Sequence, residues 1–350
     1  MIDRPQITFA AADDREARDA WQQLLQDFPA ARVHADVRWL DVLAQAYGVR
    51  GMLALARDAS GALQAGLAGY DSRTLRWRHT FHSLRHGVLA KQQAALPALL
   101  TEVSRRGRER GCVSATIGGG PRIAEGAYRE SVRHAVRLGL GNGAQSLWDG
   151  FRDKTRNTIR RAERAGMTVS NDSAHLGAFH MLYARAMTER SVNARTFKFF
   201  RALFSIFGSD ARLYSALAGR QLCGAMVIVT VGGHSAYPYG AFDDVGHRLG
   251  ANSLLLWHAA QDLAAEGVQG LDLGPSAPGS GSYRFKVHMG GMPQELHYVE
   301  LLQPKGTLQQ MTSKLPNARS RGRLDRLIGC LPMGLRIRAR TCLGRTGRLL

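Results

Sequence analysis

The chain has 350 residues, of which 45% are hydrophobic and 21% are charged. This length predicts one large or two medium domains, and the apolar fraction excludes an intrinsically disordered chain. With 47 Lys and Arg residues against 28 Asp and Glu residues, the formal net charge is +19. Such an excess predicts partners that carry phosphate or an anionic membrane surface.

In the first half, alternating and helical hydrophobic spacings predict two groups of elements. These are a helix at 36–47 with strands at 51–57 and 62–70, then a strand at 80–90, a helix at 92–110 and a strand at 112–117. The second half repeats this order of elements. Its members are helices at 176–190 and 195–207, strands at 211–218, 222–231 and 235–242, a helix at 252–266 and a strand at 270–273.

The repeated order predicts two similar α/β domains. The segment at 140–150, with the sequence LGLGNGAQSLWDG around it, is rich in glycine and is typical of a connector. We therefore expect the chain to divide there.

A basic helix is predicted at 151–164, where Arg156 and Arg160 lie one turn apart. Such a helix could line a groove that binds phosphate. The alternative is an ordinary solvated helix face.

The predicted strand at 235–242 contains Tyr237, Pro238 and Tyr239. Because proline has no N–H, it bends a strand or ends its pairing and so exposes backbone groups. Those groups could hold the donor of an acyl group, with a tyrosine as proton donor to the leaving group. The alternative is that both tyrosines pack on a sheet face.

The glycine-containing loop at 246–251 leads directly into a helix that begins at Asn252 or Ser253. Unpaired N–H groups and the positive end of a helix dipole bind anions, and Arg248 adds a charge. We expect a donor phosphate at Arg248, Gly250 and Asn252. A glycine turn capped by Asn252 is the alternative.

In the segment at 281–291, Arg284, Lys286 and His288 alternate. If the segment is a strand, the three cations share one face, which indicates an anion opposite them. The alternative is a charged edge strand that resists aggregation.

The positive charge is concentrated at the C-terminus, where residues 304–350 hold eleven Lys or Arg residues against Asp325 alone. Leucine and isoleucine alternate with arginine there, as in a helix that lies on a membrane. We expect a basic amphipathic tail whose residues 318–350 bind anionic lipid. A solvated, disordered tail and an RNA-binding tail remain alternatives.

The four cysteines are far apart and form no metal-binding or disulfide pattern, so no metal and no bound cofactor are expected. The N-terminus lacks the order of a signal peptide, and no stretch approaches about 18 apolar residues. We expect a cytoplasmic protein, peripheral at the inner face of a membrane if the tail binds lipid.

The order of these motifs resembles that of the Fem-type and BioF2-like acyltransferases of the GNAT superfamily, over most of residues 30–303. The resemblance rests on the basic helix from Arg156, the Tyr-x-Tyr-Gly-Ala strand, the loop from Arg248 to Asn252, Leu-Asp-Leu-Gly at 271–274 and Phe-Lys-x-x-x-Gly at 285–290. It implies an α/β fold of two tandem GNAT-like domains, each a mixed, mostly antiparallel sheet flanked by helices. The domains would span 1–145 and 146–303, with the donor and catalytic motifs in the second and the basic tail at 304–350.

The resemblance further implies a monomeric N-acyltransferase that transfers an acyl or aminoacyl group directly from acyl-CoA or aminoacyl-tRNA to an amine. The acceptor would be a cell-envelope or lipid-type amine, and tRNA a partner if it carries the donor. The implied catalytic residues are Lys286, Tyr237, Tyr239 and Asp272, and the implied donor-binding residues are Arg248, Gly250, Asn252, Arg156, Arg160 and Arg284. Asp272 could equally cap a loop. The alternative function is a non-catalytic RNA- or membrane-binding protein on a GNAT-like scaffold.

Overall fold

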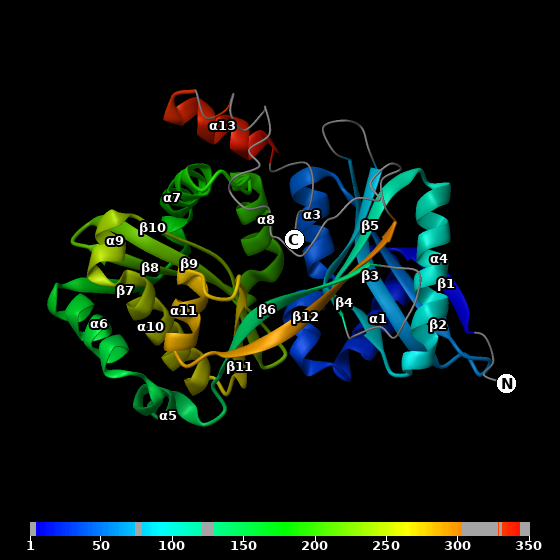
Figure 1. The fold of residues 1–350 in the computed structure, drawn as a ribbon, viewed down its shortest axis with the longest axis horizontal. Coiled ribbons are helices and arrows are strands. Elements are labelled where there is room, and N and C mark those ends of the chain that lie inside the picture. The colour runs from blue at the N-terminus through cyan, green and yellow to red at the C-terminus, as the bar shows by residue number, and fades with distance from the viewer. Residues whose placement is uncertain (1–4, 74–78, 121–128, 303–327, 329–330, 344–350) are drawn as a thin grey trace. The chain divides into compact units, whose positions relative to one another are not determined.

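A computed structural model describes residues 5–73, 79–120, 129–302, 328 and 331–343. These residues form two compact units (Figure 1). Unit 1 contains the described residues up to Arg133 together with 295–302, and unit 2 contains 134–294 and the C-terminal helix. This division lies earlier in the chain than the expected boundary at 145. In addition, residues 295–302, which were expected in the second domain, belong to unit 1.

Unit 1 is built on a six-stranded sheet in the order β1-β2-β3-β4-β5-β12, in which only β4 and β5 pair in parallel. The strands are β1 (Gln6–Ala11), β2 (Arg50–Arg57), β3 (Leu63–Arg73), β4 (His79–Ala90), β5 (Cys112–Gly120) and β12 (Met292–Leu302). Its helices are α1 (Arg15–Gln26), η1 (Pro29–Ala31), α2 (Arg32–Ala35), α3 (Arg38–Tyr47), η2 (Gln93–Ala95) and α4 (Leu96–Glu109).

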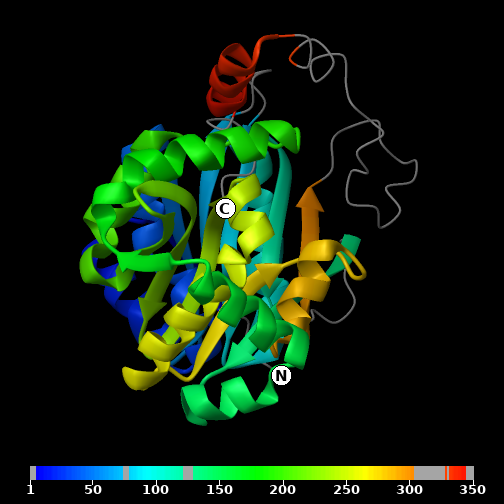
Figure 2. The same cartoon turned by 90° about the vertical axis from the view of Figure 1, so that its left-hand side faces the viewer.

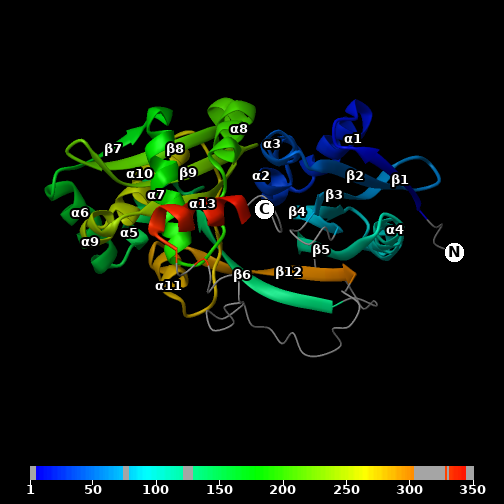
Figure 3. The ribbon, with the colours of Figure 1, turned by 90° about the horizontal axis from the view of Figure 1, so that it is seen from above.

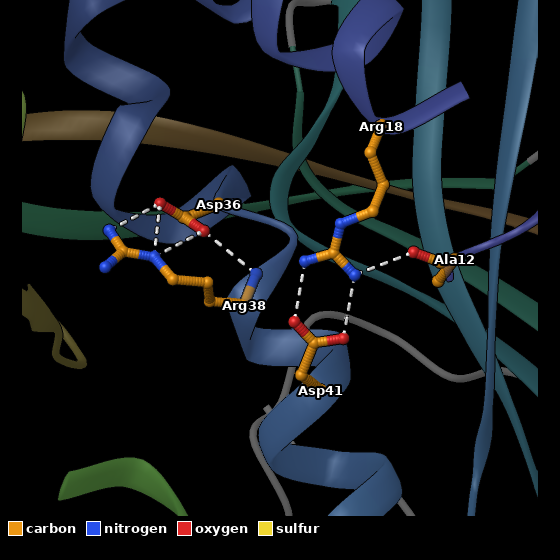
Figure 4. A network of polar contacts seen from close by, with 5 residues as sticks. All are labelled: Ala12, Arg18, Asp36, Arg38 and Asp41. Atoms are coloured by element: carbon orange, nitrogen blue, oxygen red, sulfur yellow. Dashed lines mark hydrogen bonds and ion pairs between the residues drawn. The ribbon is translucent and has the colours of Figure 1, made fainter. Parts of the chain in front are cut away.

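Two arginine–aspartate pairs fasten the N-terminal helices of unit 1 (Figure 4). Arg18 of α1 donates to both carboxylate oxygens of Asp41 on α3, at 2.9 and 2.7 Å, and to the carbonyl of Ala12 at 2.9 Å. Asp36 is buried, and its carboxylate accepts from the guanidinium of Arg38 and from the Arg38 backbone N–H. Bidentate pairs of this kind fix orientation, because two parallel hydrogen bonds leave little rotational freedom.

Unit 2 has a six-stranded sheet in the order β6-β11-β10-β9-β8-β7, in which β10 and β11 form the parallel pair. The strands are β6 (Arg129–Gly139), β7 (Met167–Asn171), β8 (Ala211–Ala218), β9 (Gln221–Val231), β10 (His234–Phe242) and β11 (Gly270–Pro275). Its helices are α5 (Gly143–Gly150), α6 (Asp153–Arg164), η3 (Ser173–His175), α7 (Leu176–Glu189), α8 (Phe197–Phe207), η4 (Gly208–Asp210), α9 (Asp244–Leu249), α10 (Ala251–Ala265), α11 (Gly281–His288) and α13 (Met333–Leu343).

Helices cover both faces of the unit 2 sheet (Figures 2 and 3). Strand β9 is therefore buried on both sides, which agrees with its almost continuous apolar sequence. Met226 and Ile228 pack into the core formed with α6 and α10. Tyr239, which lies opposite Val227 in the register, packs against Phe199 and Phe200 of α8. This layered core positions β10 at the centre of the unit.

The two units repeat one topology, as the order of predicted elements indicated. In each, four antiparallel strands are followed by a helix, a fifth strand parallel to the fourth and a sixth strand antiparallel to the fifth. The sixth strands are exchanged along the chain: β12, which follows unit 2, pairs with β5, and β6, which follows β5, pairs with β11. The glycine-rich segment expected to be a connector contains helix α5.

Candidate active site in unit 2

The parallel strands β10 and β11 pair over only three residues. Their register runs from His234–Gly270 to Ala236–Asp272 and then stops. At this point β10 has one residue too many relative to β9, because Ala236 lies opposite Val229 and Tyr239 opposite Val227. The bulge contains Pro238, so the break in pairing that the proline predicted is confirmed. Beyond it, the backbones of β10 and β11 are no longer paired with each other.

A helix N-terminus follows directly after β10. Helix α9 begins with a cap in which the Asp243 carboxylate accepts from the N–H of Gly246 at 2.7 Å, and it ends at Gly250. Gly250 has φ +90° and is the residue before α10, whose first turn has no side-chain cap. The first N–H groups of α10 therefore have no intrahelical acceptor. Most of the segment expected to be a phosphate loop is helix α9, and the turn is confined to Gly250.

Two predicted donor-binding residues flank this turn. Arg248 is exposed, and Asn252 is partly buried. The side-chain oxygen of Asn252 is buried and has no hydrogen-bond partner among the described residues. The exposed cation and the helix N–H groups of this corner suit an anion, whereas the Asn252 oxygen can accept only from an N–H or O–H group of a ligand.

Helix α6 packs on the same corner, through residues other than those expected. A Cβ at Gly250 would lie 2.5 Å from the Thr158 methyl carbon, and Arg161 donates to the carbonyl of Arg248 at 3.0 Å. The expected residues point elsewhere. Arg156 donates to the carbonyls of Trp148 and Asp149, and Arg160 lies over the Trp148 ring at 5.5 Å. Nothing in the sequence distinguished Arg161, because the rotation of α6 about its axis decides which arginine faces the corner.

The two tyrosines beside the bulge lie on opposite faces of the sheet. Tyr237 packs against the core shared with α10, and a Cβ at Gly240 would clash with its hydroxyl. Burial raises the pKa of Tyr237 well above its usual range, so this phenol stays protonated. Tyr239 is surrounded by the rings of Tyr183, Phe199 and Phe200 at 5.3–6.0 Å. Both side chains thus pack on a sheet face, and the catalytic roles expected for them stay predictions.

Asp272 caps a bulge within β11, where the register with β6 shifts between Asp272 and Pro275. Its carboxylate accepts from the N–H of Gly274 at 2.6 Å, two residues further along the chain. This is the loop-capping role that the sequence left open as an alternative. Asp272 is also the last residue of β11 that pairs with β10.

The segment that carries Arg284, Lys286 and His288 is helix α11, so the expectation of a strand with three cations on one face is wrong. The helix starts because the Ser280 hydroxyl accepts from the N–H of Tyr283 at 3.1 Å. In this helix Arg284 and His288 are exposed one turn apart, whereas Lys286 is only 8% exposed. The strand pattern failed because three alternating cations carry no apolar periodicity that could distinguish the two structures.

Lys286 makes three hydrogen bonds at the end of β11. Its ammonium donates to the carbonyls of Gly274 and Pro275, at 2.9 and 3.3 Å, and to the Ser276 hydroxyl at 2.8 Å. The Ser276 hydroxyl also lies 3.1 Å from that of Ser282. The sequence analysis missed both serines, which lie in a stretch of Gly, Ser and Pro that resembles a plain connector.

Most of the expected tail lies outside the described residues, including most of 318–350. Its described helix, α13, packs against α7 of unit 2. Among the described residues, no helix is long and apolar enough to cross a bilayer. Within the same part of the chain, no group of three or more His, Cys, Asp or Glu side chains is placed to hold a metal ion.

Comparison with known proteins agrees with this architecture. Residues 149–287 match the family model of an acetyltransferase (GNAT) domain. Among solved structures, FemX matches with a TM-score of 0.63 and 12% identity, over 80% of this chain and 95% of that chain. A tandem GNAT protein from the clavulanic acid biosynthesis pathway matches with a TM-score of 0.56 and 14% identity, over 84% of this chain and 98% of that chain. No curated protein sequence matches this chain significantly.

A third similar structure, L-PGS from Bacillus licheniformis, has a TM-score of 0.52 and 12% identity, over 82% of this chain and 91% of that chain. At such identities the structural similarity establishes the fold, and the family model identifies the domain that holds the parted strands and the α10 N-terminus. The resemblance seen in the sequence is thus confirmed: the chain shares its fold with FemX and with a tandem GNAT protein, and its residues 149–287 match a GNAT acetyltransferase domain.

Proposed function

We propose that this chain is an N-acyltransferase that forms an amide by moving an acyl or aminoacyl group directly from a phosphate-bearing donor to an amine. The donor is an acyl-CoA or an aminoacyl-tRNA. The observation that carries the proposal is the parting of β10 from β11 after Ala236–Asp272, in a strand that leads through α9 to the uncapped N-terminus of α10.

The two features suit two parts of one donor. The N–H groups at the start of α10, with the positive end of the helix dipole and the exposed Arg248, favour a phosphate. The backbone groups of β10 that have left β11 can bind the polar chain that links the phosphate to the acyl group, as an added strand would. Gly250 and Gly246 keep this corner compact, since a Cβ at either position would meet a neighbouring residue.

The reaction requires the amine nitrogen to attack the acyl carbonyl while the bond to the donor's sulfur or oxygen breaks. The developing negative charge on the carbonyl oxygen would be stabilised by backbone N–H groups freed at the bulge. No residue needs to form a covalent intermediate in this scheme. Tyr237, held protonated by burial, lies beside the bulge but faces the core.

For the acceptor we propose an amine carried by a lipid or by a cell-envelope component. Two observations support this choice. Residues 304–350 have a formal charge of +10, which would attract the chain to an anionic surface. One of the structures with the same fold is described as a putative lysylphosphatidylglycerol synthetase, an enzyme named for a lipid product.

The test is a donor assay on the full chain, in which amide products are detected by mass spectrometry after incubation with acyl-CoAs or aminoacyl-tRNAs and a lipid amine. Ionic strength separates the two donors, because tRNA binding releases many counterions and weakens steeply with salt, whereas a single CoA loses much less affinity. Absence of an amide from every donor, combined with binding of RNA or vesicles, would favour the non-catalytic alternative.

The same assay tests the position of the donor phosphate. We expect Arg248→Glu to raise the apparent KM for the donor about tenfold with little change in kcat, since it reverses a charge beside a helix-terminus anion site. Arg220→Glu is the matched control, because Arg220 is also exposed and lies in the turn between β8 and β9. Equal KM values for the donor in the two variants would show that the donor phosphate does not bind beside Arg248.

A further inference from the structure

We infer that Ser276 is the acid that protonates the leaving group of the donor, and that Lys286 is its proton source. This inference rests on the proposed function and adds a catalytic residue to it. It also gives Lys286 a role different from the one expected from the sequence, in which the lysine itself met the developing oxyanion.

The hydrogen bonds around Lys286 define the direction of the Ser276 proton. An ammonium group only donates, so the Ser276 oxygen accepts the bond of 2.8 Å from Lys286. The remaining bonds of the ammonium go to the carbonyls of Gly274 and Pro275. The hydroxyl proton of Ser276 must therefore point away from Lys286, toward Ser282 at 3.1 Å or toward a bound ligand.

The same bond makes this proton easier to lose than that of an ordinary serine. When Ser276 gives up its proton, the negative charge on its oxygen lies 2.8 Å from the Lys286 nitrogen. Lys286 is only 8% exposed, so water screens this attraction weakly. Charge-assisted hydrogen bonds of this type are about twice as strong as neutral ones.

Ser276 follows directly after Pro275, the last residue of β11, and lies beyond the part of β11 that pairs with β10. It comes four residues after Asp272, the last β11 residue that pairs with β10. The Ser276 backbone N–H still donates to the carbonyl of His134 on β6, at 2.9 Å, so this part of the chain stays with β6. The hydroxyl faces Lys286 and Ser282 of α11, just past the point where β10 and β11 part, and we place the end of the donor chain there.

Every proton given up in the transfer is replaced. The amine nitrogen attacks the acyl carbon, and the carbon–sulfur or carbon–oxygen bond of the donor breaks with its electron pair on the leaving atom. That atom takes the proton of Ser276, and the serine oxygen takes a proton from Lys286. The amide nitrogen releases its extra proton to water, and the neutral lysine regains one from water. The net products are the amide and the free thiol or alcohol.

The test compares donors that carry the same acyl group on leaving groups of different acidity. An alkyl ester or thioester needs an acid, whereas the aryl analogue has a leaving group that departs without one. For Ser276→Ala we expect kcat/KM to fall about 100-fold with the alkyl donor and only a few-fold with the aryl donor. Ser276→Thr, which keeps the hydroxyl, should restore most of the activity on the alkyl donor.

Ser282→Ala is the matched control, because it removes a hydroxyl one hydrogen bond further away and should slow both donors equally. An equal loss on both donors for Ser276→Ala would overturn the inference, since a structural defect does not depend on the leaving group. A leaving-group dependence in Tyr283→Phe instead of Ser276→Ala would also overturn it. In either case amide formation by the wild-type chain would leave the proposed function intact, and its absence would instead contradict the proposed function.

Discussion

The parallel strand pairs of the two units occupy the same place in the repeated topology and differ in how they continue. In unit 1, β4 and β5 pair from His79–Cys112, shift register after His82, and pair again at Arg85–Gly118. In unit 2, β10 and β11 pair over three residues and then part. A bulge is present in both fourth strands, so the bulge alone does not open the sheet.

The helices that follow the fourth strands, α4 and α10, also differ at their N-termini. Helix α4 is preceded by the short helix η2 and has Pro97 in its first turn, where one N–H is missing. Helix α10 follows Gly250 directly and has no proline there. In unit 1, moreover, the space beside Gly118 of β5 is taken by Tyr298, because a Cβ at this glycine would lie 2.8 Å from the tyrosine ring.

One topology thus carries a parallel pair that parts after three residues in unit 2 and one that resumes its pairing in unit 1. The distinction depends on a few residues just beyond the parallel pair, which is the general reason that function cannot be deduced from a fold. Three predictions test whether the open and the closed pair depend on these contacts.

The largest effect is expected from Lys286→Met, which removes the ammonium that binds the end of β11. Two backbone carbonyls and one hydroxyl would lose their donor in a site that is largely shielded from water. We expect the free energy of unfolding to fall by about 2–4 kcal/mol. Denaturant unfolding of the full chain measures it, with Lys198→Met on the exposed face of α8 as a control that should change stability by less than about 0.5 kcal/mol.

If Lys286→Met and Lys198→Met are equally stable, the lysine does not hold β11 in place. In that case the hydrogen bonds of Lys286 would not be what keeps the end of β11 apart from β10.

A smaller difference is expected between two glycines that end helices with positive φ. Gly48 follows α3 in unit 1 with φ +69°, and a Cβ placed there would meet no atom within 4 Å, whereas Gly250 has φ +90° and Thr158 at 2.5 Å. We expect Gly48→Ala to cost about 1 kcal/mol for backbone strain alone. Gly250→Ala should cost at least about 1 kcal/mol more, since α6 must also move. Thermal or denaturant unfolding of the two variants measures the difference in stability. Equal costs would show that α6 can move away from Gly250 without a loss of stability.

The smallest effect is expected from chemical labelling of one buried thiol in each unit. Burial raises the pKa of Cys112 in unit 1 to about 11 and raises the pKa of Cys223 in unit 2. At pH 8 both should react with iodoacetamide about 100-fold more slowly than the exposed Cys342, because the thiolate is the reactive form and both sulfurs are covered. Peptide mass spectrometry measures the three rates separately.

The ratio of the Cys112 and Cys223 rates then compares how often each unit opens. Labelling of Cys112 as fast as Cys342 would contradict the burial of this thiol in the unit 1 core.

Much of the fold was predictable from local patterns. Most helices and strands between residues 36 and 273, the repeat, and the break in β10 at Pro238 all depend on residues that are close in sequence. The strands β1, β6, β7 and β12 and helix α1 were not predicted. Gly250 was predictable as a turn for the same reason, because a glycine before an apolar helical stripe is a local signal. The motifs of the second half indicated the GNAT-like domain that the family model matches at residues 149–287.

The candidate site was predictable only in part. The sequence selected Lys286, Asp272, Arg248 and Gly250, yet it gave α11 the wrong secondary structure. It also favoured Arg156 and Arg160 over Arg161, which contacts the donor corner. Ser276 and Ser282 of the candidate site were missed. Ser276 becomes notable only because Lys286, which lies ten residues further along the chain, donates to it in the folded structure.

The sequence by itself determined the class of fold, the tandem repeat and the places where the backbone must turn or break, since these follow from propensities and hydrophobic periods over a few residues. The tertiary structure decided which strand completes each sheet, which arginine of α6 reaches the α9–α10 corner and which groups surround the Lys286 ammonium. These choices depend on pairings between residues that are far apart in the chain, such as β5 with β12 or Arg161 with Arg248. A local pattern cannot encode such partners, because the same helix or strand could bury its apolar face in several registers, and only the packing of the complete core selects one.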